Sequence, residues 1–214
     1  MVLLVAMILT GLLFPSSLGT PVPNAPASCD VEPRTVDELR DLSVSATPAT
    51  GHEMEPYFIA ESALPVGEPA SDTKVEEITR LLTVRAACLR DLDALRYFAL
   101  YTDRYLVDLF AFGGFPDDWL YPDEPFPAEP PDYRLGAVER VQLLVDGSVS
   151  AFVTHVGADI EDSYPAPGVT SLMIFTQVGG GWRIDRQYQQ YVDARGRIRF
   201  IADLLDDVAT PAQG

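Results

Sequence analysis

The chain has 214 residues, of which 47% are hydrophobic, 22% charged and 10% aromatic; this composition supports one sizeable core and excludes collagen-like and wholly disordered chains. Its 15 basic side chains against 32 acidic ones give a formal net charge of -17, which repels nucleic-acid phosphates and anionic membrane surfaces. We therefore expect no nucleic acid among its partners.

The N-terminus resembles an export signal. The apolar stretch from Val2 to Phe14 has the length of a signal-peptide core and is too short to span a bilayer comfortably. Ser17 and Gly19 stand at the spacing that a signal peptidase accepts, which predicts a signal peptide over residues 1–19. The expected protein is secreted or extracytoplasmic, with no stable membrane span once the signal is removed. The alternative, a buried N-terminal helix, is disfavoured by the Pro/Ala/Ser-rich segment that follows.

Residues 20–71 are rich in Pro, Ala, Ser, Thr and acids, and we interpret them as a tether with one short amphipathic helix starting near Thr35. Cys29 lies in this segment, and three fates remain open for it: a disulfide with Cys88, lipidation that anchors the chain to a surface, or a free thiol. Cys88 itself falls on the apolar stripe of a predicted helix, where a buried free thiol is equally ordinary. Without a C-x-x-C pair or a Cys/His cluster, we expect no metal site.

A long helix is predicted over about 74–91. Thr73 and Glu76 have capping-box spacing, and apolar residues then recur at helical intervals. The apolar face is broad enough to require a sheet as its cover.

Shorter helices follow, with Asp93 and Asp103 as predicted N-caps and Gly113–Gly114 as the stop signal. Residues 113–133 then hold many prolines and acids around aromatic side chains such as Trp119, which predicts a long loop draped over the domain as a lid.

From Arg134 onward apolar residues alternate with polar ones, which predicts antiparallel strands. An odd-length loop at Asp146–Gly147 would place all the alternating apolar residues of the first hairpin on one face, so we predict a three-residue loop with Gly147 left-handed. Those apolar residues are Val141, Leu143, Val145, Val149, Ala151 and Val153. A strand over 171–178, apolar on both faces, is expected inside the sheet, followed by a last long strand over 182–192 and a frayed tail over 204–214.

Helices followed by antiparallel strands predict an α+β fold. The order of a long helix, the phrase Leu95 to Asp103, a D-G hairpin and a closing strand that begins Gly181-Trp-Arg-Ile-Asp resembles the nuclear-transport-factor-2-like superfamily, which includes SnoaL-like cyclases and ketosteroid isomerases. The resemblance covers about residues 72–192 within an expected domain over 72–203. It implies helices packed in the concave face of a strongly curved sheet, a cone-like α+β barrel with a pocket at its open end. It implies no single reaction.

Seven residues are the predicted ligand contacts: Tyr101, Tyr105, Trp119, His155, Trp182, Arg186 and Tyr188. His155 ends an apolar stripe, where either a ligand contact or a hydrogen-bonded core residue fits the pattern. Arg186 and Tyr188 share the strand phase of Trp182 and would supply a cation and a phenol on the same face.

No catalytic residue can be assigned from the sequence. Asp103 is better explained as an N-cap than as a base, and Asp185 falls out of phase with Trp182, so it should face away from the pocket. The chain shows no serine-hydrolase elbow and no phosphate-binding glycine loop, so we expect no cofactor.

Three functional hypotheses follow. The first is a non-catalytic domain that binds a small apolar or amphipathic molecule, or a partner protein. The second is an isomerase, cyclase or dehydratase that uses a pocket acid or His155 with Tyr and Arg donors. The third is a structural or dimerising module that forms a homodimer through its open sheet face.

Overall fold

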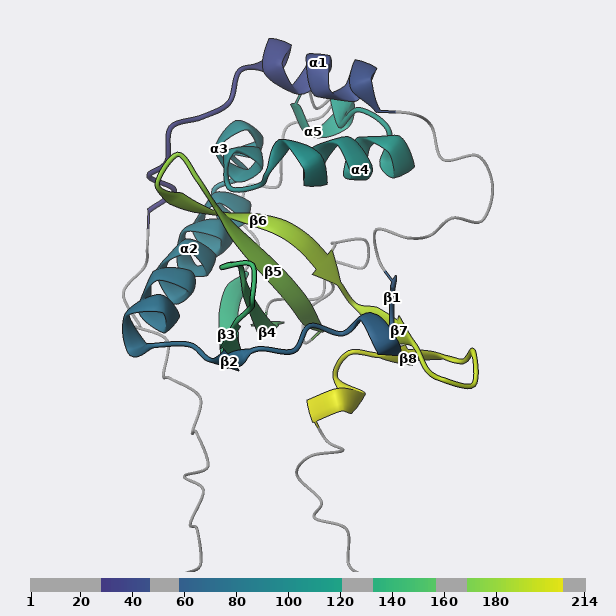
Figure 1. The fold of residues 1–214 in the computed structure, drawn as a ribbon. Helices are drawn as coiled ribbons and strands as arrows, with labels where there is room; N and C mark the ends of the chain where they lie inside the picture. The colour runs from purple at the N-terminus through teal and green to yellow at the C-terminus, as the bar shows by residue number, and fades with distance from the viewer. Residues whose placement is uncertain (1–27, 47–57, 121–132, 157–168, 206–214) are drawn as a thin grey trace, which may run out of the picture.

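The computed structural model describes residues 28–46, 58–120, 133–156 and 169–205 (Figure 1). These residues form an α+β fold whose sheets are mostly antiparallel. The helices are α1 (Val36–Ser45), α2 (Asp72–Arg90), α3 (Ala94–Ala99), α4 (Asp103–Gly113) and α5 (Asp117–Leu120), with a 3-10 turn η2 (Glu61–Ala63). The strands are β1 (Phe58–Ala60), β2 (Glu68–Pro69), β3 (Arg134–Leu143), β4 (Val149–Val156), β5 (Thr170–Val178), β6 (Gly181–Tyr188), β7 (Gln190–Val192) and β8 (Ile198–Phe200).

The main sheet has five strands in the order β2-β3-β4-β5-β6, and all of its neighbours pair antiparallel. Among the described residues it is an open sheet and does not close into a barrel. Strand β5 corresponds to the strand predicted over 171–178. It pairs with β4 on one side and β6 on the other, which confirms the prediction that a strand with two apolar faces lies inside the sheet. No helix in the described part of the chain is long and apolar enough to cross a membrane.

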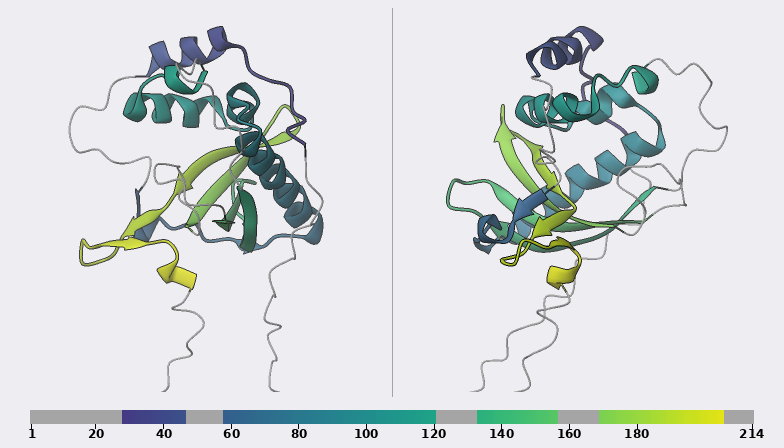
Figure 2. Two further views of the ribbon diagram at one scale, coloured as in Figure 1. Left: turned by 180° about the vertical axis from the view of Figure 1, so that it is seen from behind. Right: turned by 90° about the vertical axis from the view of Figure 1, so that its right-hand side faces the viewer.

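The predicted last long strand is divided. Gln189 separates β6 from β7, and β7 joins a second sheet in the order β1-β7-β8, where it pairs parallel with β1. A smaller core that contains Ile59, Leu172, Tyr191 and Ile201 lies between this sheet and the main one. Figure 2 shows the small sheet projecting from the end of the domain opposite α1.

The helices lie on one side of the main sheet, with α2 packed against β3 and β6 (Figure 2). The predicted capping box at Thr73 is wrong, because α2 begins at Asp72 after Ser71, whose side chain makes no capping hydrogen bond. Asp93 caps α3 as expected, since its carboxylate accepts from the backbone N–H of Arg96. The N-cap of α4 is Thr102 rather than Asp103, and the helix ends at Gly113 with Gly114 as its C-cap.

The segment interpreted as a tether belongs in part to the folded domain. The expected short helix is α1, which begins with a capping box formed by Thr35 and Glu38. Its Leu39 is fully buried in the main core, and α1 lies along α4 on the side away from the sheet (Figure 1). Arg34 donates to the carbonyl oxygens of Phe98 and Tyr101, so this N-terminal segment holds the α3–α4 connection.

Cys29 and Cys88 form a disulfide, which resolves the alternatives that the sequence left open. Cys88 is fully buried near the C-terminal end of α2, within the core. The bond therefore fastens the segment before α1 to the helix that spans the sheet.

The β3–β4 hairpin has the predicted three-residue loop. The backbone N–H of Leu144 donates to the Ser148 carbonyl, the N–H of Gly147 donates to the Leu144 carbonyl, and Gly147 has φ of 83°. Val145, however, is fully exposed in the loop and does not join the apolar face.

Bulges in β3, one of them at Arg140 with φ of 48°, change the strand phase so that Val138 faces the core.

Several predictions fall on residues that the structure does not describe. The signal peptide over 1–19, most of the lid over 121–132 and the tail after Leu205 lie outside the described residues. The described part of the lid contains the short helix α5.

Candidate functional site

A pocket of about 260 Å³ lies between α3, α4, the residues that follow α4, and β6. Its lining is mainly aromatic and aliphatic, with one amide. The lining residues are Tyr97, Phe98, Tyr101, Tyr105, Leu109, Phe110, Gly113, Gly114, Pro116 and Gln187. Pockets of this composition, with few polar groups among apolar walls, are typical of small-molecule sites.

Three tyrosines at intervals of four residues form a continuous wall of the pocket. The ring centroids of Tyr97 and Tyr101 are 5.0 Å apart, and those of Tyr101 and Tyr105 are 5.1 Å apart and nearly parallel. The row persists although the helix is interrupted after Leu100, because the interrupted backbone is held by β6. The N–H of Thr102 donates to the carbonyl of Ile184, and the N–H of Ile184 donates to the carbonyl of Leu100.

A bulge in β6 brings Gln187 into the pocket. Ile184 pairs with Phe175 and Arg186 with Ile174, so the strand gains one residue at Asp185. This extra residue reverses the alternation, and Gln187 is buried after the bulge as Ile184 is before it. The expectation that Arg186 and Tyr188 share the face of Trp182 is therefore wrong.

Behind the tyrosine wall lies a fully buried arginine, Arg85, on α2. Its Nε donates to the Tyr101 hydroxyl at 2.7 Å and one terminal nitrogen donates to the Tyr97 hydroxyl at 3.1 Å. The other terminal nitrogen lies 3.1 Å from His155 Nε2 and 3.4 Å from the Tyr133 hydroxyl. Tyr101 in turn donates to Tyr97 at 2.5 Å. One guanidinium is thus surrounded by three phenols and an imidazole.

Arg85 is a cation in this site. Burial opposes its charge, but the phenols of Tyr101, Tyr97 and Tyr133 more than offset this effect and hold the pKa of Arg85 above its ordinary value. Burial raises the pKa of the Tyr101 hydroxyl, and Arg85 reverses only part of that rise. The tyrosine is therefore neutral at physiological pH, and so is Tyr133, whose pKa is raised for the same reason.

His155 is neutral as well. Burial lowers its pKa well below the usual value, and the Arg85 cation lowers it further. Because a guanidinium only donates hydrogen bonds, His155 Nε2 accepts and the proton lies on Nδ1. This Nδ1 is buried and has no hydrogen-bond partner among the described residues. The Tyr133 ring stacks on the imidazole at 5.3 Å and fixes its orientation.

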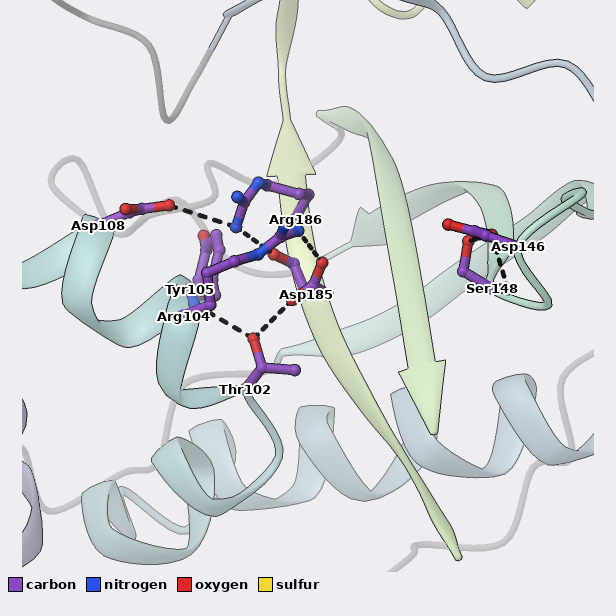
Figure 3. A network of polar contacts seen from close by, with 8 residues as sticks. All are labelled: Thr102, Arg104, Tyr105, Asp108, Asp146, Ser148, Asp185 and Arg186. Carbon is purple, nitrogen blue, oxygen red and sulfur yellow. Dashed lines mark hydrogen bonds and ion pairs between the residues drawn. The ribbon is translucent and has the colours of Figure 1, made fainter. Parts of the chain in front are cut away.

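Ion pairs join α4 to β6 beside the pocket (Figure 3). Asp185 accepts from the Thr102 hydroxyl at 2.8 Å and also pairs with Arg104. Arg186 pairs with Asp108 at 3.2 Å. These contacts hold the two elements that carry Tyr105 and Gln187 and leave both carboxylates paired with arginines.

The structure brings together only some of the predicted ligand contacts. Tyr101 and Tyr105 line the pocket, and His155 belongs to the arginine cluster behind it. Trp182 lies against the start of α2, where its indole donates to the Glu77 carboxylate at 2.8 Å.

The remaining predictions concern the strand end and the lid. Arg186 pairs with Asp108, while Tyr188 packs against the smaller core, and neither lines the pocket. The side chain of Trp119 lies outside the described residues.

Sequence reasoning missed Arg85 and Gln187. Arg85 lies seven residues after Ile78 and three after Leu82, both fully buried, so it occupies the apolar stripe of α2. A charged residue at a position of the apolar stripe indicates, from the sequence alone, a polar site within the core. Gln187 had no comparable signal, because its burial depends on the β6 bulge.

The depressed pKa of His155 predicts a pH dependence of stability. The unfolded chain protonates this histidine near pH 6.5 whereas the folded chain does not, so stability is complete above that pH and falls as the pH decreases. We expect the free energy of unfolding to fall by about 1.4 kcal/mol from this group between about pH 7.5 and 5.5. Urea titrations of the wild type and of His155→Gln at both pH values measure it. An equal pH dependence in the two proteins would contradict the assignment.

Comparisons of the chain with protein-family models, with curated proteins and with solved structures give no match. The function is therefore inferred from the geometry of the site itself.

Proposed function

We propose that this protein binds a small apolar or amphipathic molecule, without catalysis, in the pocket between α3, α4 and β6. The observation that supports this most strongly is the wall of three adjacent tyrosine rings, which line one pocket together with Leu109, Phe110 and Gln187. An apolar cavity of about 150 Å³ accommodates a benzene molecule. A pocket of about 260 Å³ therefore suits a molecule of one or two rings, or an equivalent aliphatic body.

The lining residues favour binding over catalysis. None of the described residues that line the pocket is a carboxylate or a histidine, so none of them is a general base of the usual kind. Asp103 and Asp185, the nearest candidates in the sequence, are paired with arginines.

The proposal includes the cone-like fold of the nuclear-transport-factor-2-like superfamily and an exported location. The α+β content and the order of helices before strands support the former. The disulfide supports the latter, since such bonds persist mainly in oxidising compartments.

The test is a titration with N-phenyl-1-naphthylamine, a neutral apolar molecule whose fluorescence rises on leaving water. We expect saturable binding to the wild type. In Leu109→Trp the larger side chain occupies the pocket, and we expect the affinity to fall at least tenfold. Val107→Trp is the matched control, because Val107 is also a partly buried residue of α4 but does not line the pocket. Its affinity should stay within twofold of the wild type.

Two results would overturn the proposal. One is the absence of saturable binding to the wild type. The other is an equal loss of affinity in Leu109→Trp and Val107→Trp, which would place the probe elsewhere. Thermal unfolding of both variants shows whether each has folded before its binding is compared.

A further inference from the structure

We infer that the ligand of this pocket is an anion: a small aromatic or aliphatic body that carries a carboxylate or a similar negatively charged group. This inference rests on the proposed function and adds to it the charge of the ligand. The main observation behind it is the buried cation Arg85, which lies behind the tyrosine wall.

Arg85 has no counter-ion among the described residues. Its contacts go to the hydroxyls of Tyr97, Tyr101 and Tyr133 and to His155 Nε2, and none of these side chains is a carboxylate. A fully buried charge is costly unless another charge compensates it. The orphaned Nδ1–H of His155 is a second donor in the same cluster without an acceptor. The cation calls for negative charge nearby, and the orphan donor calls for a hydrogen-bond acceptor.

The tyrosines connect this cation to the pocket. Tyr97 and Tyr101 accept hydrogen bonds from Arg85 and also form the pocket wall. Because Arg85 is fully buried, water screens its charge only weakly, and its field acts across one layer of side chains. Accepting from a cation also polarises the Tyr101 phenol, whose own O–H donates to Tyr97.

The carboxylates of α4 and β6 beside the pocket do not cancel this field, because Asp108 is paired with Arg186, and Asp185 with Arg104. Asp103 is likewise paired with Arg34 at 2.7 Å. Arg85, in contrast, is fully buried and has no paired carboxylate in the part of the chain described.

The experiment compares phenylacetate with phenylacetamide, which has nearly the same size and shape but no charge at pH 7. Binding is followed by NMR titration of the full-length protein. We expect phenylacetate to bind at least tenfold more tightly. In Arg85→Met, which keeps an unbranched apolar side chain, the preference should fall below threefold. Arg90→Met is the matched control on the same helix, since Arg90 is partly exposed, is paired with Asp91 and does not line the pocket, and it should keep the preference.

The outcomes separate this inference from the proposed function. If phenylacetamide binds as tightly as phenylacetate to the wild type, or if neither binds while N-phenyl-1-naphthylamine does, the inference is wrong and the apolar pocket stands. If none of the three binds, both fail. Should Arg85→Met not fold, the wild-type comparison still decides, and Tyr97→Phe, which removes one of the phenols that connect Arg85 to the pocket, is expected to reduce the preference.

Discussion

Replacing Arg85 with alanine is expected to lower the free energy of unfolding by about 3–5 kcal/mol. The substitution removes a fully buried side chain and leaves a cavity. It also takes the hydrogen-bond donor away from the hydroxyls of Tyr97 and Tyr101 and from His155 Nε2. Urea denaturation, followed by far-UV circular dichroism and by tryptophan fluorescence, measures the loss.

Two further variants distinguish the loss of the buried Arg85 cluster from a general effect of substituting an arginine on α2. Arg80→Ala changes an exposed arginine of α2 and should alter stability by less than about 0.5 kcal/mol. Arg85→Met combined with Tyr97→Phe and Tyr101→Phe removes the cation together with two of its acceptors, so we expect it to be more stable than Arg85→Ala. A loss of less than about 1 kcal/mol in Arg85→Ala would show that the cluster is not packed as described.

Removing the disulfide is expected to cost about 4 kcal/mol. Cys29 and Cys88 are 59 residues apart, and the loss of loop-closure entropy from the unfolded chain for a loop of this length has that magnitude. The double substitution Cys29→Ser with Cys88→Ser, compared with the oxidised wild type by urea denaturation, gives the value.

The reduced wild type is the control for this experiment. It should lose about as much stability as the double variant, because both release the segment before α1 while α1 keeps Leu39 in the core. If the oxidised wild type and the double variant unfold at the same urea concentration, the bond does not constrain the unfolded chain as we argue.

Local patterns in the sequence predicted the regular elements well. The apolar period of α2, the Asp93 cap and the D-G turn with Gly147 left-handed are determined by neighbouring residues and are present in the structure. The disulfide could not be predicted, because Cys88 fits a helix face whether or not it is bonded. The docking of α1 was missed for a similar reason: a short amphipathic helix in a Pro-rich segment gives no sign of what covers its apolar side.

The strand faces were less predictable because bulges change their phase. Alternation placed Arg186 and Tyr188 on the face of Trp182, but one extra residue at Asp185 turned Gln187 inward instead. The extra residue coincides with the point where β6 bonds to the backbone of Leu100 and Thr102, a contact between segments far apart in the sequence. Such a tertiary cause leaves no local signal.

The candidate site likewise has one part that the local sequence shows and one part that only the tertiary structure shows. The tyrosine row of Tyr97, Tyr101 and Tyr105 has helical spacing, but core packing explains that spacing better than a ligand site does. What makes it a candidate site is the buried Arg85 on one side and the pocket on the other, and these lie on different elements.

The most direct test of anion binding in this pocket is the NMR titration with phenylacetate, read residue by residue. The account predicts saturable shifts of the Gln187 side-chain amide, of the Gly113 and Gly114 backbone amides, and of the Arg85 Nε–H, all with one dissociation constant. Shifts confined to exposed apolar residues such as Ile198 and Phe200 on β8, with Gln187 and Arg85 unchanged, would contradict it.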